Sequence, residues 1–367
     1  GINRLVFHRY AHQPWLDLVP GMTFGPYGIN FERTNTWWRP GRAWVDYLTR
    51  CQSLLQSGRS DNDVLLYWPL HELWHSSPGP VTRLTVHDHA WLTQQPIGAA
   101  ARQLWERGYA FDYLSDRWLE SARVNADGRV ELPGGDYAVV LVPPTRLMPV
   151  ATLRHLLDLA QHGATVLFHN GLPDDVPGAA ALDERRAELK RLQARLTFAP
   201  VSPQLQTARL GQGRVLSGDL EAMLASAGVQ RESLCDHVGV RVIRRRDAHS
   251  RTAFIANQST RAVDGVVALT TSPAAVVVMD PMTGRTGLAE TRSADGAGTR
   301  VRVRLEPGHS IFLRAVDQAE VKGPAWSWPV PGSDSRAIEG TWHVEFIEGG
   351  PALPKSFETA NLVVKAG

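Results

Sequence analysis

Two hydrophobic patterns alternate through the middle of the chain, and this alternation limits the possible folds more than any other feature. Residues 138–142 and 164–168 are short, continuous apolar runs, and between them residues 150–162 carry apolar positions at helical spacing, followed by Gly163. Continuous runs are typical of strands buried on both faces of a parallel sheet, and a crossover helix joins two such neighbours. Residues 61–230 are therefore predicted to form an open α/β domain of the flavodoxin-like or amidotransferase-like kind.

Beyond residue 235 the hydrophobic period becomes two. Short alternating segments recur about every 10 residues, as in a β-sandwich, and turn signals such as Asp264-Gly265 and Pro307-Gly308 separate them. We place this β-sandwich at residues 231–320. Residues 321–367 begin with a linker rich in Pro, Gly and Ser and continue with a new alternating segment at 341–347. They are predicted to open a further β-domain.

The first 60 residues predict a strand, a long loop and a helix. Residues 4–8 form the short strand, and prolines and glycines punctuate the next 20 or so residues, a loop length that is often functional. A helix with one apolar face is predicted to begin near Arg42, and Gly58 stands where a glycine would end it. Both ends of the sequence fall inside apparent strands, so we expect an internal piece of a longer protein.

Composition excludes several classes of protein. The chain has 367 residues, 43% of them hydrophobic, and 39 Lys and Arg against 37 Asp and Glu, which is a net charge of +2. This near balance favours neither nucleic acid nor a membrane surface as a partner, and no apolar stretch is long enough to span a bilayer. The two cysteines, Cys51 and Cys235, cannot make a disulfide framework or a cysteine zinc site.

The common catalytic signatures are missing. There is no Walker A loop, no H-E-x-x-H and no G-x-S-x-G, and the single G-x-G at 211–213 has no third glycine. An amidotransferase needs a cysteine nucleophile at the turn after a central strand, but that turn reads Pro143-Pro144-Thr145. The α/β domain is therefore predicted to be a scaffold without a nucleophile.

Two histidine pairs have spacings that occur in metal sites. His71 and His75 are four residues apart, but the prolines around them predict a loop rather than a helix that would hold both on one face. His87 and His89 lack a third ligand. His71 and His75 are therefore interpreted as surface or interface residues, and neither pair is assigned a metal.

The opening segment is the one candidate for a functional site. Nine of the 12 tryptophans precede residue 120, and aromatic rings mixed with acid, imidazole and guanidinium groups suit a sugar, because rings stack on its C–H faces. If the strand at 4–8 belongs to a (β/α)8 barrel, the segment lies at the barrel's C-terminal face, where barrel active sites are built. The predicted sugar-binding residues are His8, Tyr10, His12, Trp15, Glu32, Arg33, Trp37 and Trp38.

A structural interpretation of the same segment stays open. Trp37 and Trp38 could pack on the following helix, and Glu32 and Arg33 could form a surface ion pair.

Four parts of the sequence carry a resemblance to a known family. The four parts are residues 1–38, residues 47–58, residues 111–116, and residues 340–342 together with 349–351. Within the first part, the similar strings include residues 10–15, 20–23, 25–28 and 36–38. Together they resemble glycoside hydrolase family 106, the α-L-rhamnosidases, densely over the first 60 residues and loosely beyond residue 120.

The resemblance implies a multidomain α/β plus β protein. Residues 1–60 would be the C-terminal part of a (β/α)8 barrel, residues 61–230 an amidotransferase-like domain without nucleophile, residues 231–320 a β-sandwich, and residues 321–367 a linker and an incomplete, sugar-binding-like jelly-roll. It also implies a bacterial enzyme in an extracellular or periplasmic location.

The resemblance further implies a calcium-assisted, inverting hydrolase that removes terminal α-L-rhamnose from glycans or glycosides. Inversion requires an acid and a base carboxylate. In the family these lie on earlier barrel strands, so no catalytic residue is assigned here, both carboxylates and the calcium ligands are expected before Gly1, and the piece alone is expected to be inactive. Glu32 beside Arg33 is interpreted as a pocket or supporting carboxylate rather than the acid.

Two other functions stay open from the sequence. The chain could be a carbohydrate-binding or scaffold protein without chemistry, or part of a β-galactosidase-like glycosidase, in which a barrel, an amidotransferase-like domain and a β-domain also occur together. Strand and helix units with two strand-end glutamates before Gly1 would distinguish an enzyme from a binder.

Overall fold

The computed structural model describes most of the chain, and its contacts divide the chain into two units. Unit 1 comprises residues 1–56, 280–285 and 327–367, and unit 2 comprises residues 57–279 and 286–326. The described residues are 2–7, 15, 17, 31–35, 37–76, 79–81, 84–85, 87–269, 273–293, 299–317, 321–328, 339–347 and 352–360.

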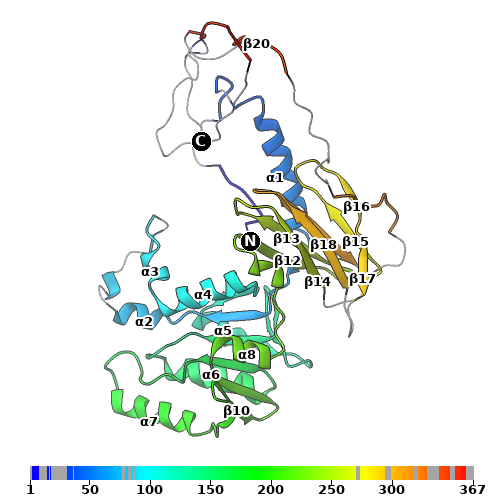
Figure 1. The fold of residues 1–367 in the computed structure, drawn as a ribbon. Helices are drawn as coiled ribbons and strands as arrows, with labels where there is room; N and C mark the ends of the chain where they lie inside the picture. Colours follow the sequence, from blue (N-terminus) through cyan, green and yellow to red (C-terminus); the bar gives the residue numbers. More distant parts are fainter. Residues whose placement is uncertain are drawn as a thin grey trace. The chain divides into compact units, whose positions relative to one another are not determined.

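Unit 2 contains a seven-stranded sheet in the order β3-β2-β7-β8-β11-β10-β9 (Figure 1). Its first five strands are parallel, and β10 and β9 extend it as an antiparallel edge. In chain order the parallel strands follow the 2-1-3-4-5 arrangement of flavodoxin-like folds. The strands are β2 (Val64–Tyr67), β3 (Phe111–Leu114), β7 (Val139–Val142), β8 (Thr165–His169), β9 (Ala199–Ser202), β10 (Leu205–Leu210) and β11 (Gly213–Gly218).

Helices cover both faces of this sheet, which explains the continuous apolar runs. Leu65 and Tyr67 of β2 belong to one hydrophobic cluster, and Val64 and Leu66 belong to the other. The first cluster is covered by α6 (Val150–Gln161) and α7 (Leu182–Gln193), and the second by α4 (Pro96–Arg107) and α8 (Leu220–Ser226). Figure 1 shows α4 on the opposite side of the sheet from α6 and α7. The predicted open α/β architecture is therefore present.

Shorter elements complete this part of unit 2. Pro96 begins α4, and Gly108 ends it in the left-handed conformation. The remaining helices and strands are α2 (Leu70–His75), α3 (Ala90–Thr93), α5 (Asp116–Ser121), the 3-10 helices η2 (Gly79–Val81) and η3 (Ser233–Asp236), and a small antiparallel sheet of β4 (Arg123–Val124), β5 (Val130–Leu132) and β6 (Gly135–Tyr137).

Two antiparallel sheets follow in unit 2, as the period-two pattern predicted. The larger has the order β1-β12-β13-β19-β15-β16, and the smaller has the order β14-β18-β17. The Asn257 amide on β13 donates hydrogen bonds to the carbonyls of Arg261, Leu305 and Glu306, and so joins the two sheets. The strands are β1 (Arg59–Ser60), β12 (Val240–Arg246), β13 (Ser250–Asn257), β14 (Val263–Leu269), β15 (Ala275–Met279), β16 (Thr286–Leu288), β17 (Thr291–Ser293), β18 (Thr299–Leu305) and β19 (Ser310–Val316).

Charged side chains connect the α/β part of unit 2 to these β-sheets. Arg244 on β12 pairs with Asp63 at 2.6 Å, and Asp63 also contacts Arg129 at 3.3 Å. Arg129 in turn pairs with Asp136, which also accepts a hydrogen bond from Arg246 of β12. Sequence reasoning did not find this network, although the Arg244-Arg245-Arg246 run and the acidic pair around residue 62 were its visible signal.

Unit 1 contains the helix α1 (Gly41–Leu55) and the hairpin of β20 (Trp342–Val344) and β21 (Phe357–Thr359). The predicted strand at 4–8 is wrong over its described residues 4–7, which form no strand. Their neighbour is the helix instead: Leu5 N–H donates to Gln52 Oε1 at 3.0 Å, and Gln56 Nε2 donates to the Asn3 carbonyl at 2.8 Å. Without an adjacent strand, no ladder of hydrogen bonds forms.

The sequence suggested that Gly58 ends α1, but the structure differs. The helix ends at Leu55 with Gln56 as its C-cap. Gly58 has φ +62°, and a Cβ atom there would lie 2.3 Å from the carbonyl oxygen of Arg246. The glycine is therefore required where β1 approaches β12.

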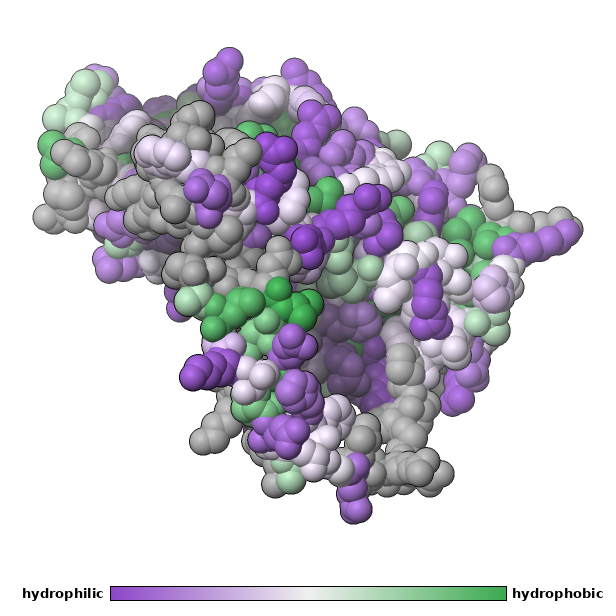
Figure 2. Space-filling model, turned by 90° about the horizontal axis from the view of Figure 1, so that it is seen from above, coloured by the Kyte–Doolittle hydropathy of each residue, from purple (hydrophilic) through white to green (hydrophobic). Residues whose placement is uncertain are grey.

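The succession of an α/β part and a β part is confirmed by the sheets. That residues 1–60 end a barrel and residues 321–367 begin a jelly-roll stays a prediction. Within the described ranges, every helix is too short or too polar to cross a membrane. The face drawn in Figure 2 carries mostly hydrophilic residues, with hydrophobic ones in separate groups.

Candidate sugar-binding segment

Five of the eight predicted sugar-binding residues lie in the described part of unit 1. These are Trp15, Glu32, Arg33, Trp37 and Trp38. His8, Tyr10 and His12 lie outside the described residues, so their predicted role is untested.

The two adjacent tryptophans belong to an aromatic cluster centred on Phe31. The ring centroid of Phe31 lies 4.9 Å from that of Trp37, 5.5 Å from Trp38, 5.8 Å from Trp44 on α1 and 5.9 Å from Phe7. Edge-to-face rings at such distances stabilise each other beyond the area they bury. Trp37 also packs on Trp44 of α1, with ring centroids 6.3 Å apart, as the structural interpretation proposed. The ring contact of Trp38, in contrast, is with Phe31. Sequence reasoning missed Phe7 and Phe31 as partners.

A tight turn before α1 positions these rings. Asn35 organises it: its N–H donates to the Glu32 carbonyl at 3.0 Å, its side-chain oxygen accepts from Trp37 N–H at 3.3 Å, and its carbonyl accepts from Trp38 N–H at 3.1 Å. Gly41 begins the helix where a Cβ atom would lie 3.2 Å from the Trp37 ring. The glycine therefore allows Trp37 to pack on the start of α1.

Glu32 and Arg33 differ in exposure. Glu32 is 8% exposed, and its Oε2 accepts a hydrogen bond from the backbone N–H of Arg33 at 2.9 Å. The Arg33 side chain is exposed and makes no ion pair with any other described residue. The alternative of a surface ion pair between the two side chains is thus not what the structure contains.

Two rings of the segment remain accessible. Trp15 is 56% exposed and Trp38 is 37% exposed. Together with the Arg33 guanidinium they can offer stacking surfaces and hydrogen-bond donors to a hydroxyl-rich ligand. The buried Glu32 carboxylate supports the turn that carries Arg33.

No metal centre occurs in the described part of the chain. Its His, Cys, Asp and Glu side chains form no group of three or more that could hold an ion. The segment of His71 and His75 is a helix, α2, so the predicted loop is wrong; Leu73 is buried and anchors it. Among the described residues there is thus no site for calcium, and the prediction that the family's calcium ligands precede Gly1 stays a prediction.

At the end of the α/β sheet where an amidotransferase would carry its nucleophile, the groups of this protein hydrogen-bond to one another. In the turn after β7, Thr145 Oγ1 donates to the Pro143 carbonyl at 2.7 Å. Glu72 of α2 accepts from the backbone N–H groups of Arg146 at 3.0 Å and Leu147 at 2.7 Å. Both amides are thus already satisfied, and sequence reasoning missed this use of Glu72.

The G-x-G at 211–213 is the turn of the β10–β11 hairpin. Gly211 has φ +59°, and a Cβ atom there would lie 2.3 Å from the Gln161 carbonyl oxygen at the end of α6. The glycine serves a turn packed against a helix rather than a nucleotide.

Comparison with solved structures defines the class of protein. A rhamnosidase from Novosphingobium sp. PP1Y matches with a TM-score of 0.71 and 26% identity, over 98% of this chain and 32% of that chain. A family 42 β-galactosidase from G. stearothermophilus matches with a TM-score of 0.50 and 12% identity, over 82% of this chain and 47% of that chain, which shows the fold alone. The fold is thus one found in glycoside hydrolases.

The family follows from the sequence. The model of glycoside hydrolase family 106, the α-L-rhamnosidases, matches residues 1–290, and the chain belongs to this family. A curated protein of Formosa agariphila, provisionally named a beta-glucuronidase, is 33% identical over 193 residues, which are 52% of this chain and 14% of that protein. The chain therefore spans only a small part of the relatives it matches.

Proposed function

We propose that this chain is part of a bacterial glycoside hydrolase that removes terminal α-L-rhamnose from plant or bacterial glycans or glycosides. The match of the α-L-rhamnosidase family to residues 1–290 carries the proposal. The exposed Trp15, Trp38 and Arg33 support it, because aromatic faces and a guanidinium are groups that hold a sugar.

The proposed reaction is a single displacement with inversion. One carboxylic acid protonates the departing oxygen while a carboxylate activates water on the opposite face of the sugar, and the two lie about 6.5–9.5 Å apart. We assign both groups to barrel strands that precede Gly1 in the whole protein. The residues of this chain bind and orient: the rings stack on the sugar, Arg33 donates to its hydroxyls, and Glu32 holds the turn that carries Arg33.

The cofactor and location are also proposals. We place any calcium site of the whole enzyme outside the described residues, so a chelator should leave the melting temperature of this chain unchanged. An extracellular or periplasmic location is proposed from the family, whose substrates are glycans and glycosides.

A specific observation favours a β-glucuronidase as the alternative function. The curated relative carries the name of a beta-glucuronidase, and the exposed guanidinium of Arg33 could equally pair with the carboxylate of a uronic acid. Neither a β-galactosidase-like enzyme nor a carbohydrate binder without chemistry has such support from a residue described here. A panel of aryl glycosides separates all of these functions.

The proposal that this chain binds the sugar while the catalytic carboxylates lie before Gly1 is tested by comparing two proteins on an aryl α-L-rhamnoside. The whole enzyme should release rhamnose with inverted anomeric configuration, observed by proton NMR before mutarotation, whereas the purified 367-residue chain should be inactive. Turnover by the isolated chain would show that its own carboxylates carry the reaction, and retained configuration would refute the proposed single displacement.

A further inference from the structure

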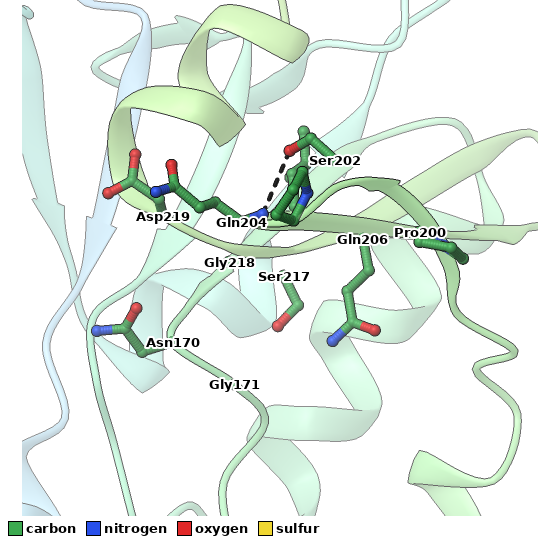
Figure 3. Close-up of a pocket in the computed structure, with 11 residues that line it drawn as sticks. Asn170, Gly171, Pro200, Ser202, Gln204, Gln206, Ser217, Gly218 and Asp219 are labelled. Carbon is green, nitrogen blue, oxygen red and sulfur yellow. Dashed lines mark hydrogen bonds between the residues drawn. The ribbon is translucent and has the colours of Figure 1, made fainter.

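A polar cleft lies at the carboxyl ends of β8 and β11 in unit 2 (Figure 3). Its volume is about 560 Å³. The carboxyl ends of parallel strands are where open α/β sheets bind ligands. The polar side chains that line it are Asn170, Ser202, Gln204, Gln206, Ser217 and Asp219.

The strand pattern shows why polar groups gather here. Ala208 of β10 and Val215 of β11 belong to the hydrophobic cluster beneath α6 and α7. Gln206 and Ser217 each lie two residues from them, toward the carboxyl end of β11, and are direct cross-strand partners. Because side chains alternate along a strand, these two share the face of the core residues. The core therefore ends at this row, and the cleft begins.

Four of these six polar side chains lack internal partners among the described residues. Ser217 is only 3% exposed, yet its hydroxyl makes no hydrogen bond with any residue that the structure describes. Within the same described part, the side-chain amides of Asn170, Gln204 and Gln206 also make none. Figure 3 shows Asn170, Ser217 and Gln206 around one open space. The Ser217 hydroxyl is accessible from the cleft, although the rest of the residue is buried. Four polar groups that surround one opening and are unpaired among the described residues can complete their hydrogen bonds with a ligand that carries several polar groups of its own.

The end of β8 has two further features of the same kind. Asn170 has φ +62°, in the left-handed region that non-glycine residues seldom adopt. The preceding His169 has a buried Nδ1 atom with no hydrogen-bond partner among the described residues. Burial lowers the pKa of His169, against an opposing effect of Asp219, which favours the neutral ring. At the end of β8, the Nδ1 atom of His169 and the side-chain amide of Asn170 thus have no hydrogen-bond partner among the described residues.

The lining selects for a neutral ligand with several hydroxyl groups. Each amide offers two donors and an acceptor, and the Ser217 hydroxyl offers both, which matches adjacent hydroxyls of a sugar. Asp219 is the one charged side chain among the described lining residues, and neither Lys nor Arg is among them. Phosphates and uronates would therefore meet no opposite charge.

We propose that this cleft binds a neutral sugar, such as the terminal unit of a glycan. A volume of about 560 Å³ falls in the range of small-molecule sites, about 300–1,000 Å³, and accommodates a monosaccharide. The lining contains no aromatic ring, so binding is weak. This inference concerns unit 2 and does not depend on the proposed hydrolysis.

Amide NMR of the 367-residue chain tests the proposal, because the side-chain NH2 groups of Asn170 and Gln206 line the cleft and report on it. Titration with methyl α-L-rhamnoside or methyl β-D-galactoside should shift the side-chain amide signals of Asn170 and Gln206. It should leave the side-chain amide signal of Gln212, in the turn at the opposite end of the strands, unchanged. Glycerol should bind more weakly than either glycoside, and D-glucuronate and inorganic phosphate should cause no shift. These arms separate a sugar site from a polyol site or an anion site.

Variants locate the binding. Ser217→Ala and Gln206→Ala should each lower the association constant about fivefold, the value of one hydrogen bond. Gln212→Ala is the matched control, since Gln212 lies in the β10–β11 turn at the opposite end of these strands; it should bind as the wild type does. If Ser217→Ala fails to fold, the exposed Gln206 carries the comparison.

Three results would overturn the proposal. They are the absence of any shift of the Asn170 and Gln206 side-chain amides at high glycoside concentration, the same affinity in the Ser217→Ala/Gln206→Ala double variant, and binding of glycerol, glucuronate or phosphate as tightly as the glycosides.

Discussion

Glu32 and Arg33 are neighbours in the sequence with opposite surroundings. The carboxylate is buried and accepts the backbone N–H of Arg33, while the guanidinium is exposed. A buried carboxylate that holds a turn fixes the position of the side chain that follows it. Arg33 is therefore the residue of this pair that is available to a substrate.

Replacing Arg33 tests that role in the whole enzyme. Arg33→Gln should lower kcat/KM for an aryl α-L-rhamnoside about tenfold, because a charge-assisted hydrogen bond to the substrate is lost. Arg42→Gln is the control, since Arg42 is exposed on α1 and pairs only with Asp46, as far as the described residues show. Steady-state kinetics of both variants test the prediction. If Arg33→Gln and the wild type have equal kcat/KM, Arg33 does not contact the substrate.

Asp175 illustrates how one carboxylate links stability to pH. Arg186 donates two hydrogen bonds to it at 2.7 and 2.6 Å, and these hold the pKa of Asp175 well below its usual range. A depressed pKa in the folded state means that the unfolded state takes up protons first as the pH falls. The stabilisation is therefore complete above about pH 5 and is lost as the pH falls through about 4 and below.

The prediction concerns melting temperatures between pH 7 and pH 3. Asp175→Asn should melt lower than the wild type at pH 7 and should lose less stability on acidification. Asp174→Asn is the control, because the Asp174 side chain makes no hydrogen bond with any other described residue. Parallel acid profiles for Asp175→Asn and wild type would contradict the assignment.

Among the elements, the strands buried on both faces were the most predictable. The apolar runs that became β2, β7 and β8 have a single physical meaning, because both faces of a covered parallel sheet must be hydrophobic. The strands β9, β10 and β11 were not predicted. β9 is exposed along its length, so its sequence resembles that of a loop. β10 buries Leu205, Ala208 and Leu210, whose spacing does not follow the regular period of two.

The helix α2 shows a second limit of sequence reasoning. Its flanking prolines predicted a loop, yet Pro69 stands before the first turn, where a missing N–H costs nothing. The contact that stabilises the region joins Glu72 to backbone amides 74 and 75 residues away. No local pattern contains information on such a pairing.

The charged network between β12 and the α/β part predicts a large effect of one arginine. Arg244 contacts Asp63 at 2.6 Å and Glu232 at 3.5 Å, and burial raises the pKa of Glu232, opposed by Arg244. Arg244→Met leaves these carboxylates with less compensation, so the free energy of unfolding should fall by about 2–3 kcal/mol. Urea denaturation measures it.

The control is an exposed pair in the same unit. Arg292 contacts Glu290 at 3.5 Å, and both side chains are almost fully exposed. Arg292→Met should change the free energy of unfolding by less than about 0.5 kcal/mol. If both arginine variants are equally stable, the network does not hold β12 to the α/β part.

At the scale of the whole molecule, the sequence predicted the order of the parts better than the location of the sites. The segment around Trp38 was found because its residues are close along the chain. The polar cleft was not found, because Asn170, Gln206 and Ser217 come from different strand ends that only the sheet brings together. Long-range juxtaposition of this kind follows from topology and leaves no local pattern.

The family assignment and the proposed substrate are separate statements about the whole molecule. Family membership is shown by the match to residues 1–290, while the chain spans 32% of the matched rhamnosidase and 14% of the curated relative. Specificity for rhamnose is therefore a proposal about the whole enzyme. Rhamnose is neutral, whereas glucuronate carries a carboxylate, so the two substrates make opposite demands on charge.

The most direct measurement is kcat/KM of the whole enzyme on a panel of aryl α-L-rhamnoside, β-D-glucuronide and β-D-galactoside. Our account predicts that the rhamnoside is hydrolysed and that the other two are cleaved at least about a hundredfold less efficiently. Hydrolysis of the glucuronide or the galactoside with no turnover of the rhamnoside would contradict it.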